Sequence, residues 1–334
     1  MRRRPGAPSV LLLALAAFAC RAATAPEPPP AESIRVATYN VEGLGRPGSA
    51  SWRALVAVLR RLGADLVLVQ EITEDDGPRR VRRLAEATGY ADLALSEVHG
   101  TLSGGLRSAC LSRSPIVESR SWSAATLAGD PRANDIGRDI LSCRIRGRGA
   151  DLVAVTVHWK AGGGAANDFR RRIEARRLGQ AIDRLRRAAP QAALVVAGDF
   201  NEDPRFTGAG RTFRRIPPGL PPTFRLGADL RLPIGGAPFS ELHKRGFRLV
   251  RAVREDAPNE VVTHPPTRRR IDLLWVEERI RVERAVVYDG CRDDGVDDPP
   301  PGDFMPLSGE PLDCAATARA ADHLPVAADL VPPR

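Results

Sequence analysis

The chain carries several apolar runs to a polar end, and this pattern limits the folds open to it more than any other feature. In VVAGDFNEDP (195–204), small and β-branched residues lead to Gly198, and Asp199 and Asn201 follow on either side of a phenylalanine. A short apolar run that closes on Asp and Asn is typical of a buried strand and a turn. For this stretch by itself a turn is the simpler interpretation, and a functional site is the alternative.

Other stretches end in a similar way. Residues 34–40, 65–71, 151–160 and 269–276 are predicted strands, and a last short strand closes the chain. The polar residues in or beside the ends of these strands are Asn40, Glu71, His158, Lys160, Asp272, Asp322 and His323. Because strands of one sheet can bring their ends to one edge, we predict that these residues form one site.

Helices alternate with these strands. Ser49 or Ser51 can cap a helix that ends at Gly63, between the first two strands. A second helix is predicted over 167–188, with Ile and Leu on its core face and most of its arginines on a solvated face. Strand–helix–strand units predict a mixed α/β architecture.

Length, composition and charge fit a globular protein. The 334 residues suit one large domain, and 43% are hydrophobic. The formal charge is +9, carried almost entirely by arginine. Such a charge suits a polyanionic partner such as nucleic acid, although a GC-rich genome produces the same composition. After the N-terminal leader no apolar run is long enough to predict a transmembrane span.

The first 33 residues have the composition of a leader and a linker. Residues 1–20 combine arginines, an apolar run and small residues, which predicts a secretory signal peptide. The peptide ends in a sequence similar to a lipobox, so Cys20 is a candidate for lipid attachment, and simple cleavage nearby is the alternative. Residues 21–33 are a Pro-rich linker. We therefore expect the protein to be exported to the periplasm, the cell surface or the medium. We also expect it to be a monomer.

Four further cysteines bear on this expectation of export. Cys110 and Cys143 lie in predicted strands, and Cys291 and Cys314 bracket a polar loop. The favoured pairing is Cys110 with Cys143 and Cys291 with Cys314, and free thiols are the alternative.

That polar loop contains several acidic residues. They are Asp293, Asp294, Asp297 and Asp298. Their oxygens suit a structural Ca²⁺, but the spacing is not that of an EF-hand, so a solvated acidic loop is the favoured interpretation.

The polar strand ends suit metal-assisted cleavage of a phosphate ester. Asn40, Glu71 and Asp322 offer the hard oxygen ligands that Mg²⁺ or Mn²⁺ prefers. A divalent cation can neutralise charge that develops on phosphorus. Asp199 can orient or deprotonate the attacking water, and the Asn201 amide can donate to a phosphate oxygen.

Two histidines complete this prediction. His158 and His323 can transfer protons or stabilise charge, and Asp272 can hold His323 in one tautomer. The other three histidines, His99, His243 and His264, lie in polar or Pro-rich stretches and are interpreted as surface residues.

Six short blocks together resemble one family. In chain order they are ATYNVEG, VLVQEI, VTVHWK, VVAGDFNEDP, RRIDLLWV and ADHLPV. They resemble the motif blocks of the endonuclease/exonuclease/phosphatase superfamily, over a single domain at about residues 34–331. The resemblance implies an α+β fold, a four-layer α/β/β/α sandwich of two packed mixed β-sheets flanked by helices.

The resemblance also implies residue roles. Asn40 and Glu71 match metal-binding positions, with Asp322 near the metal. The remaining matches are catalytic: His158 and His323 are the paired histidines, Asp272 orients the second, and Asp199 and Asn201 position the nucleophile and phosphate. Lys160 and Arg138, in GRDIL, match positions that contact substrate phosphate in some members. Ala161 and Gly162 depart from the pattern that usually follows the first histidine, which weakens the match at Lys160.

We therefore predict an exported phosphodiesterase that depends on a divalent metal and hydrolyses nucleic acid as an endonuclease or exonuclease. A phospholipid or inositol-phosphate phosphoesterase similar to sphingomyelinases is the alternative on the same catalytic centre. A non-catalytic binding protein would be expected to lack some of the metal and histidine positions, and none is missing.

Overall fold

The structure is a computed structural model that describes residues 33–99, 102, 104–147, 150–205, 211–254, 261–293 and 307–333. The predicted signal peptide with Cys20, the linker up to residue 32, and Asp294, Asp297 and Asp298 lie outside these residues.

The first of two six-stranded sheets contains the strands nearest both ends of the chain. Its order is β11 (Arg281–Val287), β12 (Val326–Val331), β1 (Ile34–Asn40), β2 (Leu66–Thr73), β4 (Leu106–Ser112) and β3 (Asp92–Leu95). The pair β1 and β2 is parallel, and every other pairing is antiparallel.

The second sheet has the same mixed character. Its order is β5 (Ile116–Trp122), β6 (Ile140–Gly147), β7 (Ala150–His158), β8 (Ala193–Asp199), β10 (Asp272–Glu277) and β9 (Phe247–Leu249). Here β7 and β8 form the parallel pair, flanked by antiparallel neighbours.

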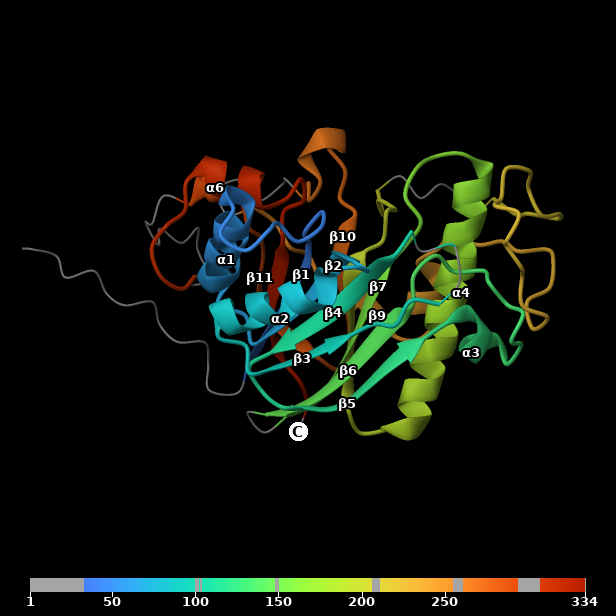
Figure 1. The fold of residues 1–334 in the computed structure, drawn as a ribbon. Coiled ribbons are helices and arrows are strands. Elements are labelled where there is room, and N and C mark those ends of the chain that lie inside the picture. Colours follow the sequence, from blue (N-terminus) through green and yellow to red (C-terminus); the bar gives the residue numbers. More distant parts are fainter. Residues whose placement is uncertain are drawn as a thin grey trace, which may run out of the picture.

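Helices cover the outer faces of both sheets (Figure 1). They are α1 (Ala50–Leu62), α2 (Gly77–Thr88), α3 (Ala124–Ala128), α4 (Ala165–Ala188), α5 (Ser240–His243) and α6 (Cys314–Ala320), with 3₁₀ turns at Pro265–Thr267 and Gly290–Arg292. In Figure 1, α1, α2 and α6 lie on one side of the sheets, and α3 and α4 lie on the other. Ser49 caps α1 and Gly63 ends it in a left-handed conformation, as predicted.

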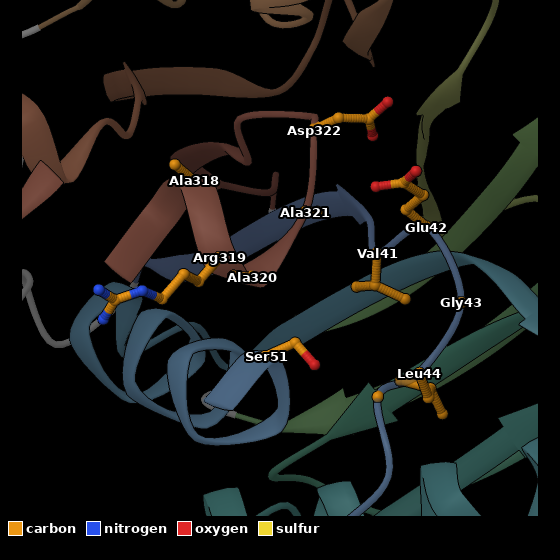
Figure 2. A pocket seen from close by; sticks show the side chains of 11 residues that line it. Val41, Glu42, Gly43, Leu44, Ser51, Ala318, Arg319, Ala320, Ala321 and Asp322 are labelled. Carbon is orange, nitrogen blue, oxygen red and sulfur yellow. The ribbon is translucent and has the colours of Figure 1, made fainter. Parts of the chain in front are cut away.

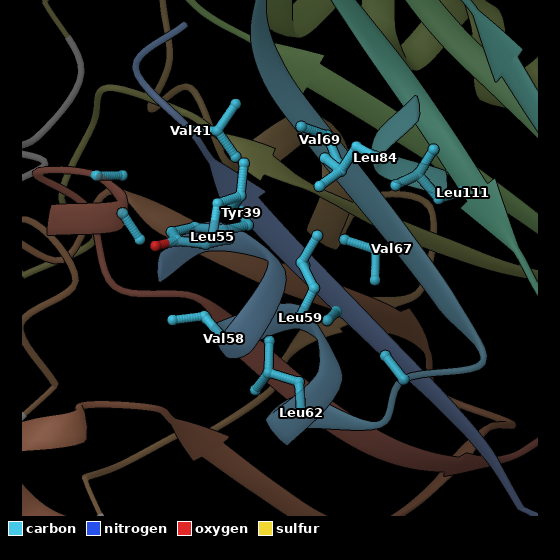
Figure 3. Close-up of a cluster of buried hydrophobic side chains, with 14 of the residues drawn as sticks. Tyr39, Val41, Leu55, Val58, Leu59, Leu62, Val67, Val69, Leu84 and Leu111 are labelled. Carbon is cyan, nitrogen blue, oxygen red and sulfur yellow. The ribbon is translucent and has the colours of Figure 1, made fainter. Parts of the chain in front are cut away.

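Three apolar clusters separate these layers. One lies between the sheets and includes Val36, Val195 and Leu274. A second packs α1 and α2 on the first sheet (Figure 3), and a third packs α4 on the second sheet. The predicted four-layer sandwich is therefore confirmed.

The arginines of α4 contradict the prediction of a mainly solvated face. Arg170, Arg171, Arg172 and Arg177 are all buried. The side chain of Arg177 is 0% exposed. It forms ion pairs with Asp135 and Asp229, which belong to segments before and after α4. The sequence pattern predicted solvent exposure because the acidic partners of Arg177 lie about 40 to 50 residues away in the chain, where a local pattern does not reveal them.

The cysteines follow the prediction for one pair. Cys291 and Cys314 are disulfide-bonded, which joins the second 3₁₀ turn to α6. Cys110 and Cys143 are free and buried, so the predicted bond between them is wrong. Both thiols lie in the apolar layer between the sheets, where reduced cysteine behaves as a small apolar side chain.

Asp293, the first acidic residue of the predicted loop, is not solvated. Asp293 is buried and accepts hydrogen bonds from Arg61, the Tyr288 hydroxyl and the Leu312 backbone N–H. Its oxygens are used by these partners. Across the described segments, no helix combines the length and the apolar character needed to span a membrane.

Candidate active site

Strand direction explains why the predicted residues meet. The parallel pairs β1–β2 and β7–β8 carry Asn40, Glu71, His158 and Asp199 at or near their C-terminal ends. The antiparallel strands β10 and β12 run the other way, so their beginnings reach the same edge. Asp272, the first residue of β10, is directly opposite Asp199, which in turn pairs with His158.

Asp199 is at the centre of this cluster and is held by two amides. The Asn40 side-chain N–H donates to Asp199 Oδ2 at 3.1 Å. Asn201 donates its backbone N–H to Asp199 Oδ1 at 2.8 Å and its amide Nδ2 to Oδ2 at 3.0 Å and to the Trp159 carbonyl at 3.0 Å. The turn after β8 thus fixes the carboxylate, and in this arrangement Asn201 positions Asp199.

Glu71 is directed into the site by an irregularity in β2. Its φ is 63°, and the pairing of β2 with β4 shifts between Val69 and Ile72. This β-bulge interrupts the alternation of side chains, which would otherwise place consecutive residues on opposite faces. Asn40 Nδ2 donates to Glu71 Oε1 at 3.1 Å, and His158 Nε2 lies 3.5 Å from Glu71 and from Asp199.

His323 and Asp272 form a buried pair beside this cluster. His323 Nδ1 lies 2.8 Å from Asp272 Oδ2, and His323 Nε2 faces Asn40 Nδ2 at 3.4 Å. Asp272 is itself anchored, because its backbone N–H donates to the Thr263 hydroxyl at 3.0 Å. The carboxylate therefore fixes which imidazole nitrogen faces the cluster.

The two histidines have opposite proton affinities. Burial, together with the charges of Arg138, His323 and Lys160, holds the pKa of His158 well below its usual value. Burial also lowers the pKa of His323, but the carboxylates of Asp272, Asp199 and Asp322 outweigh it and raise that pKa to about 10. His158 is therefore neutral and His323 is protonated at neutral pH.

Asp199 has the proton affinity of a general base. Burial and the charge of Asp272 raise its pKa to about 7, against the opposing effects of His323, Asn201 and Asn40. A carboxylate with a pKa near the working pH can both orient and deprotonate water.

The donor set fits a hard divalent cation. Ligand atoms of Glu71, His158 and Asp199 all lie within 4.8 Å of one another. In the described part of the chain, neither carboxylate pairs with a lysine or arginine, so a cation would offset their charge. Asn40 belongs to the same group through its contacts with both carboxylates, and when bound the metal would neutralise charge that develops on a phosphate.

Asp322 lies at the margin of this group. Its side chain is 35% exposed, and its Oδ1 is 3.8 Å from His323 Nε2. With His264 and His323 it forms a second set whose ligand atoms lie within 4.8 Å of one another. Its role as a metal ligand stays a prediction.

His264 belongs to the site, which the sequence did not indicate. Its Nε2 is 3.3 Å from Asp322 Oδ2, its Nδ1 is 2.6 Å from the Thr267 hydroxyl, and its ring centroid is 4.6 Å from that of His323. The interpretation of His264 as a surface residue is wrong. Two threonines of the same loop support the site, since Thr267 contacts His264 and Thr263 accepts from the Asp272 backbone N–H, but neither marks His264 in the sequence.

The other two histidines lie elsewhere. His99 bonds Asp139 at 2.6 Å and is partly exposed, and His243 packs edge-on against Trp275.

Lys160 and Arg138 lie beside the cluster, on the side of α4. The Arg138 guanidinium donates to the Trp159 carbonyl at 3.4 Å, the same carbonyl that accepts from Asn201. Burial and the charges of Arg138 and Arg170 lower the pKa of Lys160. Both predicted phosphate contacts therefore adjoin the catalytic group, and their roles stay predictions.

A pocket of about 320 Å³ lies between the loop after β1 and α6, with Asp322 in its lining (Figure 2). Figure 2 shows Glu42 and Asp322 at the same end of this pocket, while Arg319 points away. Asp322 joins this pocket to the cluster, and the two carboxylates make that end of the pocket acidic.

The fold and this cluster together define the class of metal-dependent phosphoesterases. The model of the Endonuclease/Exonuclease/phosphatase family matches residues 37–323, and the chain belongs to that family. No curated protein matches the chain.

Solved structures agree on the fold. An endonuclease/exonuclease/phosphatase from Beutenbergia cavernae is 21% identical, with a TM-score of 0.56 over 90% of this chain and 72% of that one. A family protein from Bacteroides thetaiotaomicron is 17% identical, with a TM-score of 0.54 over 92% of this chain and 100% of that one. TDP2 from Caenorhabditis elegans is 11% identical, with a TM-score of 0.53 over 90% and 74%.

Proposed function

We propose that this chain is an exported phosphodiesterase that uses Mg²⁺ or Mn²⁺ to hydrolyse nucleic acid. The observation that carries the proposal is the convergence of Glu71, His158 and Asp199 with the His323–Asp272 pair at an edge shared by the two packed sheets. Export rests on the leader in residues 1–20, and nucleic acid is supported by the basic charge and by Arg138 and Lys160 beside the cluster.

Each residue has a role that follows from its protonation and contacts. Asp199, fixed by Asn40 and Asn201, orients a water molecule and accepts its proton. Protonated His323, held by Asp272, donates a hydrogen bond to a phosphate oxygen as negative charge grows there.

Neutral His158 and the carboxylate of Glu71 lie next to each other in the cluster. Asn40 and Glu71 would hold the cation, with Asp322 near it, and His158, which lies 3.5 Å from Glu71, would contact the phosphate. Neutral imidazole keeps a hydrogen-bonding nitrogen available without adding a charge that would repel the metal.

Cleavage assays test this proposal. The chain without its leader is incubated with plasmid DNA, single-stranded DNA and RNA, with Mg²⁺, with Mn²⁺ and with chelator. Cleavage of at least one nucleic acid that requires the metal is expected. Release of phosphocholine from sphingomyelin, or of phosphate from an inositol phosphate, without nucleic-acid cleavage would assign the alternative substrate class instead.

A further inference from the structure

The N-terminal half of α4 is bonded to two segments beside the active site through one buried carboxylate. Glu174 accepts hydrogen bonds from the backbone N–H groups of Lys160, at 2.8 Å, and of Gly137, at 3.3 Å. Arg170 lies four residues before Glu174, so both side chains project from one face of the helix. This face therefore adjoins the segment of Gly137 and Arg138 and the segment of Lys160.

Three cations meet at this place around the single carboxylate of Glu174. Gly137 is in close contact with the Arg170 guanidinium, since a Cβ built on it would lie 2.9 Å from Nη2. Among the residues that the structure describes, Arg138, Lys160 and Arg170 form no ion pair, and the oxygens of Glu174 are used by the two backbone amides. Each cation raises the electrostatic cost of the others.

Arg170 is the least compensated of the three. The residue is 4% exposed, and its Nε and Nη2 atoms are buried without a hydrogen-bond partner. Burial and the charge of Arg138 lower its pKa, against the attraction of Glu174. Buried donors are costly when unpaired, and an unpaired buried charge costs more. With one carboxylate for three cations, a further anion would stabilise this arrangement.

The cations are reachable from the catalytic group. Arg138 Nε is likewise buried without a partner, while other atoms of Arg138 and Lys160 reach solvent. The Trp159 carbonyl accepts from both Arg138 and Asn201, and Asn201 holds Asp199. An anion on the three cations would thus adjoin the phosphate under attack.

We propose that Arg170, together with Arg138 and Lys160, forms a subsite for a second phosphate of the substrate, next to the phosphate that is cleaved. The inference rests on the proposed function and extends it. It assigns Arg170 to substrate binding, and it predicts that cleavage depends on a charged phosphate on one side of the broken bond.

A double-mutant cycle tests the subsite. The substrates are the trinucleotide TpTpT and its two analogues in which one phosphate is a neutral methylphosphonate, and the enzymes are the metal-loaded wild type and R170Q. For one analogue the wild type should lose on the order of 10- to 100-fold in kcat/KM, the range expected for hydrogen bonds to a charged group. R170Q should be slower on TpTpT and should lose little more when that phosphate is neutral.

Arg187 on the same helix provides the matched control. It is exposed near the end of α4, so R187Q removes one charge from the helix away from the site and should behave as the wild type does. Equal losses by R170Q on all three substrates would overturn the subsite while leaving the proposed function in place. A wild type that cleaves no nucleic acid would overturn both.

Stability gives a second readout that a structural arginine would not match. If Arg170 awaits a ligand, R170M should leave the melting temperature of the ligand-free protein unchanged or raise it. R177M removes the arginine paired with Asp135 and Asp229, and it should lower that temperature. An R170M protein that melts as early as R177M would show that Arg170 is structural.

Discussion

At the scale of single residues, His323 links the acidic cluster to the rest of the protein. Its Nδ1 is held by Asp272, and Asp272 is held in turn by Thr263 and by its place at the start of β10. The imidazolium is therefore presented in one orientation before any substrate binds. Preorganised charge of this kind is more effective than charge that must be arranged during the reaction.

Replacing His323 tests the catalytic role of this pair. H323A should lower kcat by about 10²–10³-fold, the usual cost of removing one preorganised donor to developing negative charge, and should leave the fold intact. D272N should cause a smaller loss, because the imidazole remains but its charge and orientation are less well supported. Steady-state kinetics and circular dichroism measure the two effects.

A matched control for D272N is D151N. Asp151 pairs with Arg144 near the opposite end of β7. D151N therefore neutralises a carboxylate of the same sheet that lies outside the site. H323A with the activity of the wild type would contradict the catalytic role of His323.

The same pair makes stability depend on pH. The folded pKa of His323 is about 10, above the value near 6.5 expected in the unfolded chain. Its stabilisation is therefore complete below pH 6.5 and is lost as the pH rises through 10. In chelator, the difference in unfolding free energy between wild type and H323Q, measured in urea, should shrink from pH 6.5 to 10.5. A difference that stays constant with pH would contradict the assigned charge, and D272N should show a weaker pH dependence.

The sequence identifies residues whose chemistry is visible locally. Asn40, Glu71, His158 and Asp199 follow apolar runs, so their meeting could be predicted from strand direction. His264 and Arg170 have no local signal, because their surroundings come from Asp322 and Gly137, distant in the chain. Contacts of this kind require the tertiary fold.

At the scale of secondary-structure elements, the site depends on irregularities at strand ends. Within the described residues, four non-glycine residues have positive φ, and three of them, Glu42, Glu71 and Asn201, lie at the site. Such conformations are costly and persist where the surrounding structure enforces them. The strands and the caps of α1 were predictable from the pattern of apolar and capping residues. The bulge at Glu71 was not predictable, because no glycine marks it in the sequence.

Gly198 sets the distance between the two strands that carry His158 and Asp199. A Cβ at this position would collide with the carbonyl oxygen of Val157 on β7. We therefore expect G198A to push β8 away from β7, to cost about 2–3 kcal/mol of unfolding free energy, and to lower activity by misplacing Asp199. Urea unfolding and kcat measure these effects.

Gly163 offers the control for this substitution. It lies in the loop before α4, no atom is within 4 Å of a Cβ built on it, and its φ is not positive. G163A should change the unfolding free energy by less than about 0.5 kcal/mol. If G198A were equally mild, the close approach of β7 and β8 would not constrain the site.

At the scale of the whole molecule, each sheet contributes one parallel strand pair to a shared edge. Asn40 and Glu71 come from the first sheet, and His158 and Asp199 from the second. The site therefore exists only while the sheets remain packed, and the apolar layer that contains Cys110 and Cys143 holds them together. Burial raises the pKa of the Cys143 thiol, which keeps it protonated and unreactive.

The state of the cysteines can be measured directly in a chain that lacks residues 1–20. Denatured without reductant, it should show two free thiols, Cys110 and Cys143, and the native protein should show none accessible to a thiol reagent. Reduction should expose four and should lower the unfolding free energy by about 3 kcal/mol, because Cys291 and Cys314 close a loop with a separation of 23 residues. C291S should reproduce that loss of stability while the thiols between the sheets stay inaccessible. A denatured protein without free thiols would mean that a bond joins the two sheets, and its reduction should then also reduce activity, since both sheets supply the site.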